Sequence, residues 1–133
     1  MGETIIEKII RHNTGKAVKP GDIVTVNVDR VMIHDIFIPF VADKFEEMGF
    51  TKLHDPDKVV LIYDHLVPAS QQDDTRHFRT GDAFAEKYGL THVHRSDGIC
   101  HQLMTEAGYV KPGDIAFGTD SHTTTYGCVG AFS

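Results

Sequence analysis

The 133-residue sequence has no tryptophan, only two cysteines and no long hydrophobic run. Cys100 and Cys128 lie far apart without a CxxC pair, so neither a disulfide framework nor a zinc ribbon is predicted, and each is expected to be a buried small residue. No apolar stretch approaches the roughly 20 residues that span a bilayer. The N-terminus, MGETIIEKII, lacks the basic start of a secretory signal. We therefore expect a cytoplasmic protein without a membrane partner.

Clusters of lysine and arginine are missing as well. The net charge of -6 argues against binding to nucleic acid or to an anionic surface, so a small anionic substrate would have to be held by local donors. The length corresponds to one domain with a modest core. What the sequence does have is nine histidines, several of them next to acidic residues. These pairs of acidic residues and histidines are the main indication of function in the sequence.

Hydrophobic periodicity and turn residues predict alternating helices and strands. The predicted helices are 3–12, 39–48, 81–89 with Thr80 as N-cap, and 98–107; the predicted strands are 23–28, 59–65, 91–96 and 115–117. Strands that alternate with helices at this spacing indicate an α/β domain with a largely parallel sheet flanked by helices. The hexapeptide VKPGDI occurs at both 18–23 and 110–115. It marks either a duplicated unit or a recurring turn that leads into a strand.

Polar residues gather where the predicted strands end, and ligands of parallel α/β sheets bind beyond the carboxyl ends of the strands. These residues are Asp29, Arg30, His34 and Asp35 after the first strand, Asp64 and His65 after the second, Ser96, Asp97 and then His101 after the third, and Asp120, Ser121 and His122 after the fourth. Because unrelated residues would be scattered, this coincidence predicts one site at one edge of the sheet.

The residue types at this edge suit proton transfer. An acid beside a histidine orients the ring, fixes its tautomer and favours its protonated form. Several such pairs suit a reaction in which a departing hydroxyl must receive a proton. Ser121 and the backbone amides that follow it, at a predicted helix N-terminus, would suit a carboxylate.

Each of these groupings also has a structural explanation. Asp120 or Ser121 could be a helix cap, and His101 could be a hydrogen-bonded structural residue. His92 and His94 alternate along a predicted strand and therefore point to the same face, which would suit a metal ion. Because they precede the end of the strand, we favour a packing or surface role for these two histidines.

Four segments, VKPGDIVTVNVDRVMIHD, YDHLVPA, DGICHQ and GTDSHTTTYGCVGAF, occur in an order and spacing that resembles the N-terminal part of the aconitase family. The likeness covers essentially the whole chain and is closest to the large subunits of 3-isopropylmalate dehydratase and homoaconitase. It implies that residues 1–133 are the N-terminal part of an aconitase-like α/β/α domain, without the cluster-binding and C-terminal swivelling parts. Members of the family are hydro-lyases that use a [4Fe-4S] cluster, whose open iron binds the substrate hydroxyl.

The resemblance also implies roles for individual residues. His65, oriented by Asp64, would donate a proton to the departing hydroxyl. His101 would lie beside that hydroxyl, Asp120 and His122 would form a second pair around it, and Ser121 and His34 would contact substrate carboxylates. None of these residues is expected to be a metal ligand.

The same likeness implies that other parts of the enzyme lie outside this segment. The cluster ligands, a catalytic serine and carboxylate-binding arginines are expected there, together with a small subunit that carries the swivelling domain. This chain alone should then be inactive. His34 stands where aconitases proper carry glutamine, which favours an alkyl-branched malate, as in leucine biosynthesis, over citrate. Homoaconitase and 2,3-dimethylmalate dehydratase large subunits are alternatives.

Two interpretations outside the family remain open at this point. Ser121 could be the nucleophile of a hydrolase, although Asp120 and His122 flank it directly and make a relayed triad awkward. The chain could also be a non-catalytic α/β module whose histidines are structural.

Overall fold

The structure is a computed structural model that describes residues 2–133. Its centre is a 4-stranded sheet in the order β3-β2-β1-β4. The strands are β1 (Arg30–His34), β2 (Val59–Ile62), β3 (His92–His94) and β4 (Ala116–Gly118). Each neighbouring pair in this sheet is parallel, which confirms the predicted α/β class.

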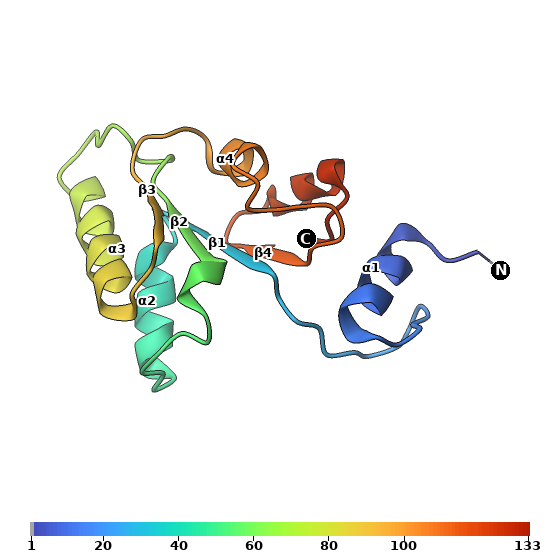
Figure 1. Ribbon diagram of the computed structural model, residues 1–133. Helices are drawn as coiled ribbons and strands as arrows, with labels where there is room; N and C mark the ends of the chain where they lie inside the picture. Colours follow the sequence, from blue (N-terminus) through green and yellow to red (C-terminus); the bar gives the residue numbers. More distant parts are fainter. Residues whose placement is uncertain (1) are drawn as a thin grey trace.

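Helices cover both faces of the sheet (Figure 1). One layer consists of α2 (Ile38–Glu47) and α3 (Asp74–Tyr88), and the other of α4 (Cys100–Glu106) and the 3₁₀ helix η2 (Thr123–Val129). A short 3₁₀ helix, η1 (Pro56–Lys58), leads into β2, and α1 (Ile5–Thr14) is set apart from the sheet. No helix between residues 2 and 133 combines the length and apolar character that crossing a membrane requires.

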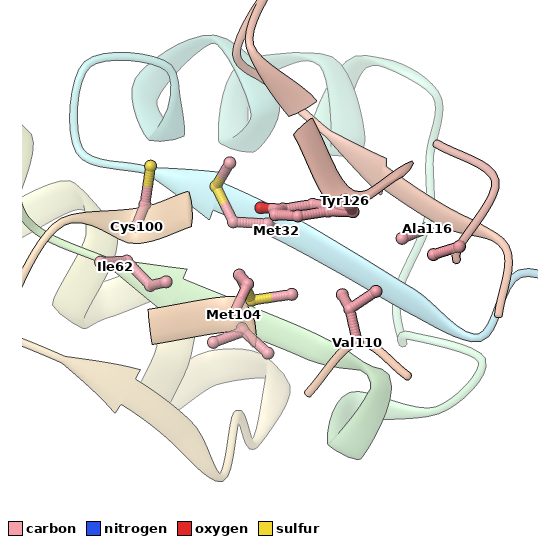
Figure 2. Packing of buried hydrophobic residues seen from close by; sticks show 9 residues of the cluster. Met32, Ile62, Cys100, Met104, Val110, Ala116 and Tyr126 are labelled. Carbon is pink, nitrogen blue, oxygen red and sulfur yellow. The ribbon is translucent and has the colours of Figure 1, made fainter. Parts of the chain in front are cut away.

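The central strands are buried on both faces because their side chains alternate between two cores. Val59 and Leu61 of β2 pack towards α2 and α3, whereas Val60 and Ile62 pack towards α4 and η2. A continuous apolar run is the pattern expected of such a strand. Figure 2 shows the second core, in which Met32, Met104 and Tyr126 meet. Each fully buried side chain of this size contributes about 1.5–3 kcal/mol to folding.

The predicted strand at 23–28 is wrong. These residues form no strand, and Ile23 is fully exposed. The parallel pairing of β1 begins only where Arg30 pairs with Ala116 of β4 and Val31 pairs with Val59 of β2. On the β2 side the preceding residues form η1, and on the β4 side they form a Pro-Gly turn, so residues 23–28 have no strand beside them.

Because β1 begins at Arg30, two residues that we expected at the carboxyl ends of the strands lie elsewhere. Asp29 and Arg30 lie at the amino end of β1, opposite the edge where we expected them. The carboxylate of Asp29 accepts a hydrogen bond from the Ile115 amide, and the Arg30 guanidinium donates to the carbonyl oxygens of Asp57 and Tyr109. Both residues therefore tie strands and loops together.

The third helix is longer than predicted. It begins at Asp74, and Thr80 lies inside it and does not cap it. The carboxylate of Asp74 accepts hydrogen bonds from the backbone amides of Ser70 and Gln71, which fixes the loop that enters the helix. The first turns carry few apolar residues, so hydrophobic periodicity did not reveal them.

The two VKPGDI segments fold into the same turn. The amide of Lys19 donates to Asp22 Oδ2 at 2.8 Å, and the amide of Lys111 donates to Asp114 Oδ2 at 2.8 Å. The glycine after each proline adopts a positive φ, 97° in the first turn and 91° in the second, a conformation that favours glycine. A recurring turn therefore accounts for the identical residues, although only the second copy leads into a strand of the sheet.

Candidate active site

The candidate site lies at the carboxyl ends of the strands, where chain segments distant in sequence converge. His34 ends β1, Asp64 and His65 follow β2, and Asp120 follows β4. His101 comes from the first turn of α4, which packs over β1. Parallel strands bring their carboxyl ends to one edge, so the topology itself assembles these side chains.

Asp64 fixes the orientation of His65. The Nδ1 atom of His65 lies 2.7 Å from Asp64 Oδ1, and the other carboxylate oxygen of Asp64 accepts a 2.7 Å hydrogen bond from the Cys100 amide. Asp64 is therefore anchored to the start of α4 and cannot easily turn away. With Nδ1 engaged by a carboxylate, Nε2 is the nitrogen of His65 that remains for chemistry.

Asp120 is the centre of a second group. Its Oδ1 atom accepts hydrogen bonds from His101 Nε2 at 2.8 Å and from the His122 amide at 2.7 Å, and it lies 3.0 Å from His122 Nδ1. Burial acts to raise the pKa of Asp120, but the hydrogen bonds from the His122 amide and from the two imidazoles outweigh it. They hold the pKa of this carboxyl well below its usual range, so Asp120 is an ionised acceptor.

The two groups face each other across a short gap. His65 Nε2 lies 3.8 Å from Asp120 Oδ2, which is too long for a hydrogen bond. An oxygen atom beside this gap could reach both the imidazole nitrogen and the carboxylate oxygen. The arrangement can therefore donate a proton to a bound oxygen from His65 and accept a hydrogen bond from the same oxygen at Asp120.

His34 and Asp35 form the buried floor beneath His65. His34 is 1% exposed, and its ring stacks on the ring of His65, with 4.2 Å between centroids. Neither ring nitrogen of His34 has a hydrogen-bond partner within the described residues. His34 Nδ1 is 3.8 Å from Asp35 Oδ1, also beyond hydrogen-bond reach. A buried imidazole with two unused nitrogens is suited to a further polar group.

Asp35 ties the end of β1 to the loop that carries His65. Its carboxylate accepts hydrogen bonds from the backbone amides of His65 at 3.2 Å and Leu66 at 2.8 Å. Burial acts to raise the pKa of Asp35, but the neighbouring His34 ring and the two amides together lower it. Asp35 is 0% exposed and is thus a buried negative charge beneath the site.

Ser121 lies at the exposed rim of the site. Its Oγ atom is 3.4 Å from His122 Nδ1, the same nitrogen that faces Asp120. One nitrogen cannot relay a proton between the two, so the geometry disfavours a serine-hydrolase triad. The predicted helix N-terminus after Ser121 is a 3₁₀ helix, η2, and the His122 amide is already used by Asp120.

All seven predicted site residues belong to one connected group. They are His34, Asp64, His65, His101, Asp120, Ser121 and His122. Ser96 and Asp97 do not join it: Asp97 bonds to His94 Nδ1 at 2.8 Å. His94 Nε2 in turn lies 2.8 Å from the hydroxyl of Tyr109, which also contacts His92. His92 and His94 thus contact Tyr109 and Asp97, which is consistent with the packing or surface role that we favoured for them.

The sequence did not reveal two neighbours of the site. Tyr126 Oη lies 3.1 Å from His101 Nδ1, and the buried Cys100 lies beside Asp64 and His65. The partner of the Tyr126 hydroxyl is 25 residues away in the chain, and no local pattern shows which residue of the GTDSHTTTYG segment turns inward.

A [4Fe-4S] cluster does not fit the cysteines of this chain. Such a cluster is held by three or four thiolates, and the sequence has two cysteines. Burial, together with the hydrogen bond to Asp64 and its charge, raises the pKa of Cys100 to about 12, which disfavours the thiolate. Cys128 is exposed, whereas the sequence led us to expect both cysteines to be buried.

Comparison with known proteins places these observations in a family. Residues 5–133 match the family described as the aconitase family (aconitate hydratase). The 3-isopropylmalate dehydratase large subunit 1 of Methanopyrus kandleri is 41% identical over 134 residues, and the large subunits of Methanoregula boonei and Moorella thermoacetica are 40% and 43% identical. Each alignment covers 100% of this chain but 32% of the relative, so the chain spans about a third of their length.

Proposed function

The chain belongs to the aconitase family, and from this premise we propose that it forms the N-terminal part of a hydro-lyase. The enzyme would remove and re-add water on a hydroxy di- or tricarboxylic acid. Relatives named as large subunits of 3-isopropylmalate dehydratase support this reaction class. Because the chain corresponds to 32% of those proteins, the activity is proposed for the longer protein. The chain alone is expected to be inactive.

One observation carries the proposal: the free nitrogen of His65 faces the carboxylate of Asp120 across 3.8 Å. Removal of water requires a proton donor for the departing oxygen, and an imidazole held by an acid is suited to this task. Asp64 would stabilise the protonated His65, whose Nε2–H would donate to the hydroxyl oxygen. The ionised Asp120 would accept a hydrogen bond from the hydrogen that this oxygen already carries, and that hydrogen would leave with the oxygen as water.

The remaining residues would position these groups and bind the substrate. His101 and His122 hold Asp120 Oδ1, which leaves Oδ2 directed towards His65. Ser121 at the rim would donate to one substrate carboxylate. The ring nitrogens of His34 have no hydrogen-bond partner among the described residues, and one of them would donate to the other substrate carboxylate once neighbouring side chains expose the ring.

The cofactor and partner are proposals for the longer protein. Membership of the family implies an iron–sulfur cluster, and this chain lacks a thiolate set for it, so its ligands would lie in the part of the longer protein beyond this segment. The relatives are named as large subunits, which supports a small subunit as partner, and we propose that this subunit carries the swivelling domain. We also propose a cytoplasmic setting.

We propose an alkyl-branched malate, 3-isopropylmalate, as the substrate. The longer protein, combined with its small subunit and with iron and sulfide restored, should form the conjugated alkene from isopropylmalate, followed by ultraviolet absorbance. Homoaconitate should be hydrated at a lower kcat/KM. A preference for homoaconitate would overturn the substrate assignment, and inactivity with every hydroxy acid tested would overturn the reaction class.

A further inference from the structure

Both ring nitrogens of His101 are engaged, and their partners restrict where the ring can carry hydrogen. His101 Nε2 lies 2.8 Å from Asp120 Oδ1. An ionised carboxylate can only accept, so Nε2 must carry the hydrogen of this contact. The other nitrogen, Nδ1, lies 3.1 Å from the hydroxyl of Tyr126. Whether Nδ1 donates or accepts here decides if His101 is charged or neutral.

Tyr126 is 0% exposed and its hydroxyl has no other hydrogen-bond partner within residues 2–133. Burial, reinforced by the neighbouring Cys100, Asp120 and Asp64, raises the pKa of Tyr126 and keeps the hydroxyl protonated. If the hydroxyl donates to Nδ1, every polar atom of the contact is satisfied. If Nδ1 carried a hydrogen, the hydroxyl hydrogen would be buried without an acceptor, which costs free energy.

We propose that Tyr126 is a positioning residue that holds His101 in the neutral tautomer with hydrogen on Nε2. As a deepening of the proposed function, this assigns different tasks to two histidines of the site. His101 presents a fixed N–H to Asp120 and to any oxygen bound beside it, and does not act as a base. His65, whose Nε2 is free, is then the histidine that transfers a proton.

The packing around Tyr126 suits this role. Its ring lies in the core formed with Met32 and Met104, and the hydroxyl is at the end of the ring nearer Cys100 (Figure 2). The rings of Tyr126 and His101 are 5.6 Å apart between centroids. A hydroxyl on a ring held by a close-packed core cannot follow movements of the site, so it fixes the imidazole in one place.

The test uses the full-length protein with its small subunit and restored cluster, labelled with ¹⁵N-histidine. In the wild type, the His101 signals, identified by their loss in His101→Gln, should show a protonated Nε2 and an unprotonated Nδ1 at neutral pH. In Tyr126→Phe, Nδ1 should also take up a proton while Nε2 keeps its hydrogen towards Asp120, so the charged imidazolium should appear, and kcat should fall about tenfold with KM little changed. Tyr109→Phe is the matched control, because it removes the hydroxyl 2.8 Å from His94 Nε2, outside the site.

Two results would overturn the assignment: a protonated Nδ1 on His101 in the wild type, or a Tyr126→Phe enzyme with the wild-type tautomer and the kcat of Tyr109→Phe. The first result does not depend on Tyr126→Phe, so a folding defect in that variant leaves the test intact. The wild type's failure to act on any hydroxy acid would contradict the proposed function, while the tautomer of His101 would still decide the role of Tyr126.

Discussion

At the scale of single residues, buried carboxylates decide where the histidines of the site can lie. Asp64 holds His65 by its ring and Asp35 holds the same residue by its backbone. An ionised carboxylate that accepts several N–H groups is a strong anchor, and its removal leaves those groups without partners. The acidic residues of this site therefore position the histidines as well as provide charge for the proposed chemistry.

Replacement of Asp35 by asparagine should destabilise the protein by about 3 kcal/mol, because the amide group loses the charge and cannot accept from both the His65 and Leu66 amides. Urea unfolding would measure the loss. Asp43→Asn is the control, because Asp43 is exposed on α2, and it should change stability by less than about 0.5 kcal/mol. Equal stabilities for the two variants would contradict the anchoring role.

At the scale of helices and strands, the sequence predicts those elements whose caps and hydrophobic pattern lie within the element itself. The capping box of Thr4 and Glu7 and the left-handed Gly15 bound α1 close to its predicted range. The buried run of β2 is equally clear in the sequence. Residues 23–28 show the limit, because they have strand-forming side chains but no neighbouring strand. Whether a β-branched segment pairs depends on distant residues that a local pattern does not contain.

The contact between β4 and η2 gives a prediction at this scale. A methyl group added at Gly118 would overlap Thr123 Oγ1 and would lie 2.9 Å from Thr123 Cγ2 and 3.2 Å from Met32 Cε. Gly118→Ala should therefore lower stability by about 1–3 kcal/mol. It should also disturb the site, since Thr123 Oγ1 donates to the Asp120 carbonyl oxygen.

Gly127→Ala is the matched control for this variant. Nothing lies within 4 Å of a methyl group added at Gly127, and its φ is not positive. Its thermal unfolding should match the wild type or occur at a slightly higher temperature. If Gly118→Ala unfolds at the same temperature as Gly127→Ala, the close packing of β4 against η2 is contradicted.

At the scale of the whole molecule, the site should make stability depend on pH. The pKa of Asp120 is lower in the folded chain than the ~3.9 of an unfolded aspartate. Its ionised form therefore stabilises the fold above about pH 4, and this contribution is lost as the pH falls through the folded pKa. Asp120→Asn should be less stable than the wild type at pH 7, and the two should converge below pH 4. A constant difference across this range would contradict the lowered pKa.

The sequence predicted which polar residues gather at one edge of the sheet better than it predicted the contacts that hold them there. Asp–His neighbours such as Asp64 and His65 are visible as pairs, and the alternation of strands and helices brings them to one edge. The contact of His101 with Tyr126 depends on how α4 packs against η2. Such packing is decided by the complete core, so no local pattern of residues could reveal it.

Proton donation by His65 beside the ionised Asp120 is tested by steady-state kinetics of His65→Gln in the proposed longer enzyme, combined with its proposed small subunit. The control is His54→Gln, because His54 is exposed in the loop between α2 and η1. We expect kcat for isopropylmalate to fall by about a hundredfold or more in His65→Gln and to stay unchanged in His54→Gln. A His65→Gln enzyme that keeps the wild-type kcat would contradict it.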